Sequence, residues 1–287
     1  MSFTAGRYDT WGSPDRHVEA LSKLFKTSCV YGQFNAIVTL TFILLLLFNH
    51  TAMAADGYLN LTAGAEYTSG DYGGSESIDE WYLPFTGRYT TDRYTFRLTI
   101  PYLRVTAPEG TLSGTTLPDT GARITEDGLG DIIAGVTYRD ALNTDISSDV
   151  TLDFTAKVKF GTADETRGLG TGENDYTVQA ELYKYLYQFT PYAILGYKFR
   201  GDPPGINLQD SCLTLVGGNF RVTQALTAGM DYYFRQASLT GLDDHKELTA
   251  FFGYKLSSTQ YLRGYLIKGF GDASPDWGAG FLISFKQ

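Results

Sequence analysis

The chain has 287 residues, is rich in glycine and aromatic residues, and carries a formal net charge of -9 at pH 7. An acidic chain with no basic stripe is not expected to bind nucleic acid. Cys212 is the one cysteine outside the N-terminal leader described next, which excludes a disulfide framework or a cysteine-based zinc site in the mature chain.

The first predicted element is a leader. Residues Ala36 to Phe48 form an apolar run that is shorter than the roughly 20 residues a membrane-spanning helix needs. Lys23 and Lys26 precede this run, and Ala52-Met53-Ala54 supplies the small-x-small pattern of a signal cleavage site. We therefore predict a signal segment over 1–54 that is removed, and a mature domain over 55–287. An uncleaved anchor helix is the alternative.

From Tyr58 onward, about twelve segments alternate polar and apolar residues at the length of a tilted membrane strand. The clearest is Ser147–Phe160, where Asp149, Asp153, Lys157 and Lys159 share one face and apolar side chains share the other. In chain order, the predicted strands are Tyr58–Thr68, Ile78–Tyr89, Tyr94–Thr106, Leu129–Arg139, Ser147–Phe160, Tyr176–Tyr187, Phe189–Arg200, Cys212–Val222, Ala225–Gln236, Glu247–Leu256, Tyr261–Phe270 and Trp277–Phe285.

The connections between these strands alternate in length along the whole chain. Short turns follow the even strands, and longer segments rich in Gly, Asp, Ser and Pro follow the odd ones, such as Ala107–Gly128 and Gly161–Asp175. This rhythm is typical of outer-membrane barrels, which have short periplasmic turns and longer outer loops. The predicted fold is therefore all-β, a single antiparallel transmembrane β-barrel of about twelve strands in the outer membrane of a Gram-negative bacterium. A soluble periplasmic β protein is the alternative.

Tyrosines near the strand ends are expected to form two aromatic girdles at the membrane boundaries. The predicted girdle residues are Tyr58, Tyr67, Tyr89, Tyr94, Tyr138, Tyr176, Tyr187, Tyr232, Tyr254 and Tyr261.

Charged side chains on the polar faces are expected to line the lumen, because a Lys or Arg facing hydrocarbon at mid-membrane costs about 2–4 kcal/mol. Two interpretations remain open: the charges line a passage for solutes, or acids and bases pair and close it. The candidate lumen residues are Glu80, Arg88, Arg97, Asp131, Asp149, Asp153, Lys157, Lys159, Glu181, Lys198, Asp231, Arg235 and Arg263, with Arg139, Glu247 and Lys255 on the same faces.

An enzymatic role is not expected, and we predict no catalytic residue, cofactor or metal site. Asp243-Asp244-His245 is interpreted as a polar loop tip, and the Gly-Leu-Gly-Thr-Gly stretch from Gly168 is not followed by the helix of a phosphate loop. The expected partners are membrane lipid, lipopolysaccharide, the barrel-assembly machinery and a small-molecule solute. Acidic loop residues such as Glu173, Asp175 and Asp272 could bridge lipopolysaccharide through divalent cations, although a solvated surface is favoured.

Three glycine-rich stretches carry a family resemblance: Gly128–Arg139, Lys159–Thr162 with Gly168–Tyr176, and Leu195–Asp202. In their order and spacing they resemble a family of bacterial outer-membrane barrels named for the MetA pathway of phenol degradation. The resemblance implies an outer-membrane channel or transporter for small organic solutes, aromatic ones included. The alternative is a structural or surface-interaction barrel with a plugged lumen and acidic outer loops.

Overall fold

The computed structural model describes residues 57–108, 123–142 and 149–287. The expected leader, residues 1–54, lies outside this range. No helix in the described residues is long and apolar enough to cross a membrane.

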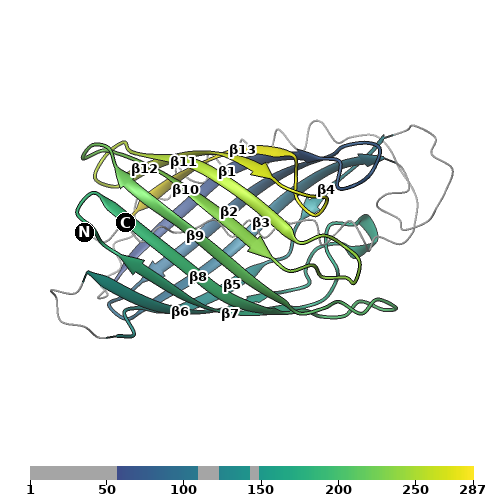
Figure 1. Cartoon of the computed structure of the whole chain (residues 1–287), viewed down its shortest axis with the longest axis horizontal. Coiled ribbons are helices and arrows are strands. Elements are labelled where there is room, and N and C mark those ends of the chain that lie inside the picture. The colour runs from purple at the N-terminus through teal and green to yellow at the C-terminus, as the bar shows by residue number, and fades with distance from the viewer. Residues whose placement is uncertain (1–56, 109–122, 143–148) are drawn as a thin grey trace.

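The strands join into one antiparallel sheet that closes on itself, since β1 pairs with both β2 and β13 (Figure 1). Two strands, β4 and β5, both pair with β3, so they are the two halves of the fourth strand. The predicted twelve-stranded antiparallel barrel is confirmed. The strands are β1 (Tyr58–Gly70), β2 (Ile78–Thr90), β3 (Tyr94–Pro108), β4 (Arg123–Leu129), β5 (Ile133–Tyr138), β6 (Val150–Lys159), β7 (Asp175–Lys184), β8 (Phe189–Phe199), β9 (Ser211–Arg221), β10 (Leu226–Arg235), β11 (His245–Lys255), β12 (Gln260–Gly269) and β13 (Trp277–Lys286).

The fourth strand is interrupted, and its expected span Leu129–Arg139 is wrong. β4 begins at Arg123, inside the segment interpreted as a loop, and the pairing with β3 breaks after Leu129. Tyr102 pairs with Leu129 and Thr99 pairs with Ile133, so two residues of β3 face three residues of the fourth strand. One extra residue is a β-bulge, and because side chains alternate with a period of two, it reverses which positions face inward.

The short turns lie at one end of the barrel, together with the C-terminus, and the longer loops lie at the other end (Figure 1). The fully described short turns cover 91–93, 185–188, 222–225 and 256–259. The fully described long loops cover 71–77, 160–174, 200–210, 236–244 and 270–276. We call these the turn end and the loop end of the barrel.

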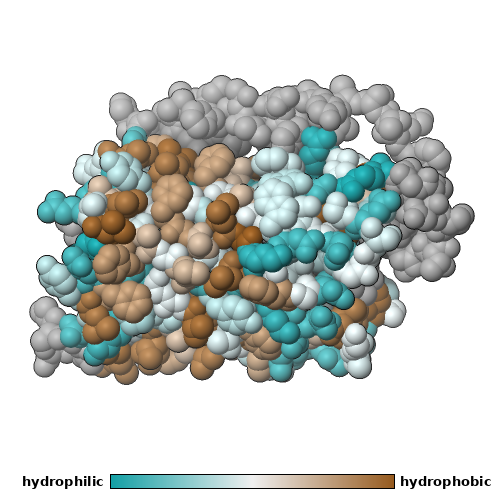
Figure 2. Space-filling model, turned by 45° about the horizontal axis from the view of Figure 1, so that its top comes forward, coloured by the Kyte–Doolittle hydropathy of each residue, from teal (hydrophilic) through white to brown (hydrophobic). Residues whose placement is uncertain are grey.

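The exterior of the barrel carries an apolar band nearer the turn end, whereas the loop end is hydrophilic (Figure 2). Leu98, Phe154 and Leu195 are exposed there, with 46%, 49% and 63% of their surfaces accessible. A continuous exposed apolar band is unfavourable in water but suits a bilayer. The barrel therefore spans the membrane at the band and projects beyond it at the loop end.

Aromatic residues lie at the edges of the apolar band. The ring of Tyr67 lies 5.2 Å from that of Trp81 and 5.4 Å from that of Trp277, measured between centroids, and Tyr94 lies 5.6 Å from Tyr138. These outward rings fit the expected girdles.

Two of the predicted girdle tyrosines do not face lipid. Tyr58 and Tyr261 share the strand face opposite their outward neighbours Leu59 and Leu262, so both rings point into the barrel. The Lys286 ammonium lies 3.9 Å from the Tyr58 ring centroid. Proximity to a strand end was therefore not enough to place these two rings in the girdle.

Candidate solute pathway in the barrel interior

Most of the candidate lumen residues lie on the inner wall, because they alternate with the exposed apolar side chains of the exterior. Asp149 is an exception, since it precedes β6 and is exposed. Arg139 follows β5 at the turn end, where Nη1 donates a hydrogen bond to the Thr91 carbonyl (3.1 Å). Asp131 lies in the bulge of the fourth strand. The inward-facing candidates are Glu80, Arg88, Arg97, Asp153, Lys157, Lys159, Glu181, Lys198, Asp231, Arg235, Glu247, Lys255 and Arg263.

A buried ion network joins β6, β7, β8 and the bulge. The Lys159 Nζ lies 2.6 Å from an Asp131 carboxylate oxygen and 3.6 Å from one of Asp175, and the Lys198 Nζ lies 2.8 Å from Asp175. All four side chains are buried, where an unpaired charge would be costly. Asp175 is thus the first residue of β7 rather than an outer-loop acid, which corrects both its interpretation as a lipopolysaccharide bridge and its interpretation as a solvated surface residue.

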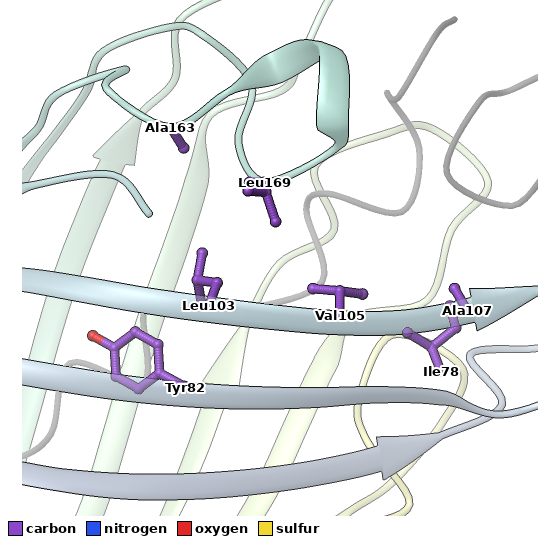
Figure 3. Close-up of a cluster of buried hydrophobic side chains, with 7 residues drawn as sticks. All are labelled: Ile78, Tyr82, Leu103, Val105, Ala107, Ala163 and Leu169. Carbon is purple, nitrogen blue, oxygen red and sulfur yellow. The ribbon is translucent and has the colours of Figure 1, made fainter. Parts of the chain in front are cut away.

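The loop over 160–174, which we call the inner loop, folds back against the inner face of β3. Its residues Ala163 and Leu169 pack with the inward-facing Leu103 and Val105, and Ile78 and Ala107 belong to the same cluster (Figure 3). Leu169 has 1% of its surface accessible. The expectation of a solvated outer loop is therefore wrong for this segment, because its apolar side chains are buried inside the wall.

Polar contacts fix the inner loop at its base. The Ala163 amide donates to an Asp131 carboxylate oxygen (3.0 Å), and the Ile132 amide donates to the Thr162 hydroxyl (2.9 Å). In each bond one partner belongs to the bulge and the other to the base of the inner loop. The bulge therefore directs the Asp131 side chain toward the inner loop. It does so by interrupting the regular alternation of inward and outward side chains along the strand.

A 3₁₀ turn, η1 (Glu165–Arg167), forms the tip of the inner loop. The Asp164 carboxylate accepts a hydrogen bond from the Thr166 amide (3.0 Å), and Gly168 ends the turn with a φ of 67°, a conformation that favours glycine. The Arg167 Nε lies 2.7 Å from a Glu126 carboxylate oxygen on β4. This ion pair is partly exposed, unlike the network at the base of the loop.

Two glycines in the family-like stretches permit this packing. A Cβ at Gly128 would lie 2.8 Å from the Leu169 Cδ1, and a Cβ at Gly170 would lie 2.7 Å from the Ala163 Cβ. Both distances are shorter than van der Waals contact, so a larger residue at either position would displace the loop. These two glycines therefore allow close contact between this loop and the wall.

The inner wall also carries apolar surface that the sequence reading missed. One cluster on β7 to β10 contains Tyr183, Tyr192, Ile194, Leu213, Leu215 and Tyr233. A second cluster on β11 to β13 contains Phe251, Tyr265, Ile267 and Leu282. The signal was available in β9, where Leu213 and Leu215 alternate with Cys212 and Val216, so that both strand faces contain apolar residues.

Tyrosine hydroxyls hold several of the inward carboxylates. Tyr183 donates to Glu181 (2.7 Å), Tyr265 donates to Glu66 (2.7 Å), and Tyr192 donates to Asp231. These bonds leave the tyrosine rings in the apolar clusters and satisfy the buried acids. The interior therefore contains tyrosine rings next to carboxylates that are held by hydrogen bonds from the tyrosine hydroxyls.

His245 is the first residue of β11 and is buried, which corrects its placement on a solvated loop tip. Its Nε2 lies 2.9 Å from a Glu247 carboxylate oxygen, and its Nδ1 lies 2.7 Å from the Ala273 carbonyl oxygen. Asp244 accepts a hydrogen bond from the Ala237 amide (3.0 Å). These contacts join the start of β11 to the neighbouring connections at the loop end of the barrel.

No protein-family model and no curated protein matches the sequence. Among solved structures, the COG4313 outer membrane channel from Pseudomonas putida F1 has a TM-score of 0.63 and 14% identity, with 84% of this chain and 98% of that chain covered. The NanC porin has a TM-score of 0.52 and 10% identity over 78% and 98% of the two chains, and the KdgM porin has 0.51 and 6% over 79% and 98%.

At these identities the similarity shows the fold. This chain has the fold of the outer-membrane barrels, with the apolar exterior that a bilayer requires. The protein is accordingly located in the outer membrane of a Gram-negative bacterium, in agreement with the sequence prediction.

Proposed function

We propose that the protein is a channel that passes small organic solutes, including aromatic compounds, across the outer membrane. The observation that carries the proposal is the composition of the inner wall, where the cluster around Tyr192, Leu215 and Tyr233 lies among charged side chains. Concave apolar surfaces with a few fixed polar groups are typical of sites for small organic molecules. Tyrosine adds a ring face for stacking and a polar edge.

The family resemblance supports this proposal. The stretches Gly128–Arg139 and Gly168–Tyr176, which resemble the phenol-degradation family, form the bulge, the base of the inner loop and the start of β7. We therefore propose membership of that family as well. The P. putida protein and the two porins that share the fold are themselves described as channels or porins, which favours transport over catalysis.

A structural barrel with a closed interior is the competing candidate. It is favoured by the inner loop, which is packed against the wall by Leu169, and by ion pairs such as Lys198–Asp175. Under this alternative the charges would serve folding and the outer loops would bind partners.

Planar bilayers distinguish the two candidates. If the protein is a channel, the purified barrel produces discrete conductance steps and admits aromatic ions such as benzoate. The absence of steps, together with no solute entry into liposomes, would establish the closed barrel instead.

Ile194 and Leu195 provide a matched pair for this assay, because they are adjacent on β8 and face opposite sides. Ile194 is 4% exposed and belongs to the inner apolar cluster, whereas Leu195 is 63% exposed on the lipid side. We expect Ile194→Ala to change benzoate conductance beyond the scatter between wild-type channels, and Leu195→Ala to leave it unchanged. Equal effects of the two variants would contradict a solute pathway along this cluster.

We further propose that residues 1–54 are removed during export, that the barrel-assembly machinery inserts the barrel, and that the outer loops face lipopolysaccharide. Sequencing of the N-terminus of protein purified from outer membranes tests the first step. We expect it to begin at Ala55, and a terminus well before Ala55 would contradict cleavage.

A further inference from the structure

A row of inward-facing residues crosses the wall from β1 to β9, each in direct register with the next. Its members are Asn60, Arg88, Arg97, Gly135, Lys157, Thr177, Lys198 and Ser211. Four of these eight positions are cationic and none is acidic. Paired residues on neighbouring strands point to the same side of a sheet, so the row is continuous on the inner wall. We call it the basic row.

The basic row runs from the turn end of the barrel toward the loop end. Arg88 lies two residues before the end of β2 at the turn end, whereas Lys157 lies two residues before the end of β6 at the loop end. Strands in these barrels tilt by about 35–45° and lie about 4.8 Å apart, so a row perpendicular to them rises around the wall. Arg139 adds positive charge beside Arg88 at the lower end.

Neutral residues flank the basic row between β1 and β5. In the described part of the chain, the rows on either side contain Tyr58, Thr90, Thr95 and Thr137 below, and Thr62, Thr86, Thr99 and Ile133 above. Their hydroxyls bond to one another, as between Thr86 and Thr99 (2.9 Å) and between Thr95 and Thr90 (3.3 Å). The wall positions next to Arg88 and Arg97 in these two rows are therefore uncharged.

The upper end of the row already binds a carboxylate. Asp175 lies between Lys198 (2.8 Å) and Lys159 (3.6 Å), and its backbone starts β7. The row thus runs from the turn end to a carboxylate site that the chain fills with its own residue.

An apolar surface lies on the opposite side of the barrel from Arg88 and Arg97, nearer the loop end. β9 is six positions from β2 in either direction around the twelve-position barrel, so Leu213 and Leu215 of β9 face the side that carries Arg88. By the same count, Tyr233 of β10 faces the side that carries Arg97. A solute with an anionic group and an apolar ring would therefore meet both kinds of surface along its path through the barrel.

We propose that the channel prefers small organic anions with an apolar body, carboxylates above all, and that Arg88, Arg97 and Lys157 select the charge. The inference rests on the proposed channel function and names its substrate class. Arginine and lysine bind carboxylates through charge-assisted hydrogen bonds, and a row of them provides successive sites along a path.

Reversal potentials in planar bilayers test the charge preference. The permeability of benzoate at pH 8 is compared with that of benzyltrimethylammonium, which has a similar ring and the opposite charge. We expect the wild type to favour benzoate, and the double variant R88Q/R97Q to reduce the permeability ratio about tenfold, the lower range of charge focusing in clefts. The double variant R88K/R97K keeps both charges and should retain the preference.

Two further variants make the outcome decisive. Arg123→Gln removes a positive charge at the loop end, where Arg123 pairs with Asp79 at 2.7 Å, and should leave the ratio unchanged. Gly135→Glu places a carboxylate within the row without removing an arginine. Its Cβ would lie 3.3 Å from the flexible Lys157 Cγ, so the wall accommodates it. This variant should lower the ratio in a barrel whose circular dichroism matches the wild type.

Failure of this inference differs from failure of the proposed function. A wild type that conducts both ions equally, or a ratio unaffected by R88Q/R97Q and by Gly135→Glu, would overturn the anion preference and leave the channel intact. A wild type with no conductance would overturn the channel and the preference together.

Discussion

The two halves of β3 show opposite arrangements of the same alternating pattern. From Tyr94 to Tyr102, Phe96 and Leu98 face outward and Thr95 and Arg97 face inward. From Leu103 to Ala107 the apolar residues face inward and the polar ones face outward. The first half is surrounded by lipid and the second by water, so the surrounding medium decides which face of a strand is apolar.

The bulge of the fourth strand lies at the boundary between these halves. It faces Ile100 and Pro101 of β3, just before the polarity of β3 inverts. Below it, β5 joins the lipid-facing barrel. On the loop-end side of the bulge, β4 belongs to the part of the barrel that projects into water. Buried apolar residues lie inside this part, and the inner loop packs against them as a loop of a soluble protein would.

The largest expected effect comes from the base of the inner loop. Asp131→Ala leaves Lys159 without its nearest carboxylate in a buried site, and breaking one partner of a buried pair costs about 3–5 kcal/mol. The measurement is urea unfolding in lipid vesicles, followed by circular dichroism.

The double variant D131A/K159M provides the control. It removes both charges, so we expect it to recover a substantial part of the lost stability. If the single and double variants unfold at the same urea concentration, the pair does not stabilise the loop base.

The next effect compares the two halves of β3 directly. Leu98→Arg places a charge in the lipid band and should cost about 2–4 kcal/mol, because Leu98 lies midway between Tyr94 and Tyr102. Arg104→Leu, on the same face but beyond the band, should cost at most about 1 kcal/mol, the upper range for an exposed charge interaction. Similar costs for both would show that the membrane boundary on β3 is misplaced.

The exposed ion pair of the inner loop should contribute less than the buried one. Arg167→Ala removes the contact with Glu126. The Arg167 side chain is 42% exposed and that of Glu126 is 34% exposed, and ion pairs with this exposure contribute at most about 1 kcal/mol. The same urea titration, repeated at high salt, should show no further loss in the variant. A cost comparable to that of Asp131→Ala would contradict the distinction between the tip and the base of the loop.

The smallest effect concerns the cap of η1. The side-chain hydrogen bond from Thr166 lowers the pKa of Asp164 below its ordinary value. A lowered folded pKa means that the cap stabilises the loop above the unfolded value of about 4 and loses this contribution as the pH falls through the folded value. Carboxyl titration by NMR in micelles should show the lowered pKa, and Thr166→Val should move it back upward. An unchanged pKa in that variant would exclude the hydrogen bond as the cause.

The sequence was sufficient to predict the barrel itself. Strict alternation in segments such as Val150–Lys159 identified the faces, and the rhythm of short and long connections distinguished a membrane barrel from a soluble sheet. It also placed the charges of Arg88, Arg97 and Lys157 on the inner face. These features depend on local periodicity, which a single sequence records.

Features that depend on tertiary contacts were not predictable in the same way. The bulge adds one residue at Gly130–Ile132, and nothing in its composition distinguishes it from a regular strand opening. The inward fold of the inner loop depends on Leu169 meeting Leu103 and Val105, which are about sixty residues away in the chain. The apolar inner wall was not predicted, because charged residues identify the inward face of a strand, whereas apolar residues on both faces, as in β9, do not.

The aromatic contacts of Tyr67 have a spectroscopic consequence. Two of the chain's three tryptophans, Trp81 on β2 and Trp277 on β13, flank this tyrosine on β1, and β1 with β13 forms the seam between the first and last strands. Trp277 meets Tyr67 only when that seam is formed. The intrinsic fluorescence of these tryptophans would therefore report closure of the barrel during membrane insertion, without any added label.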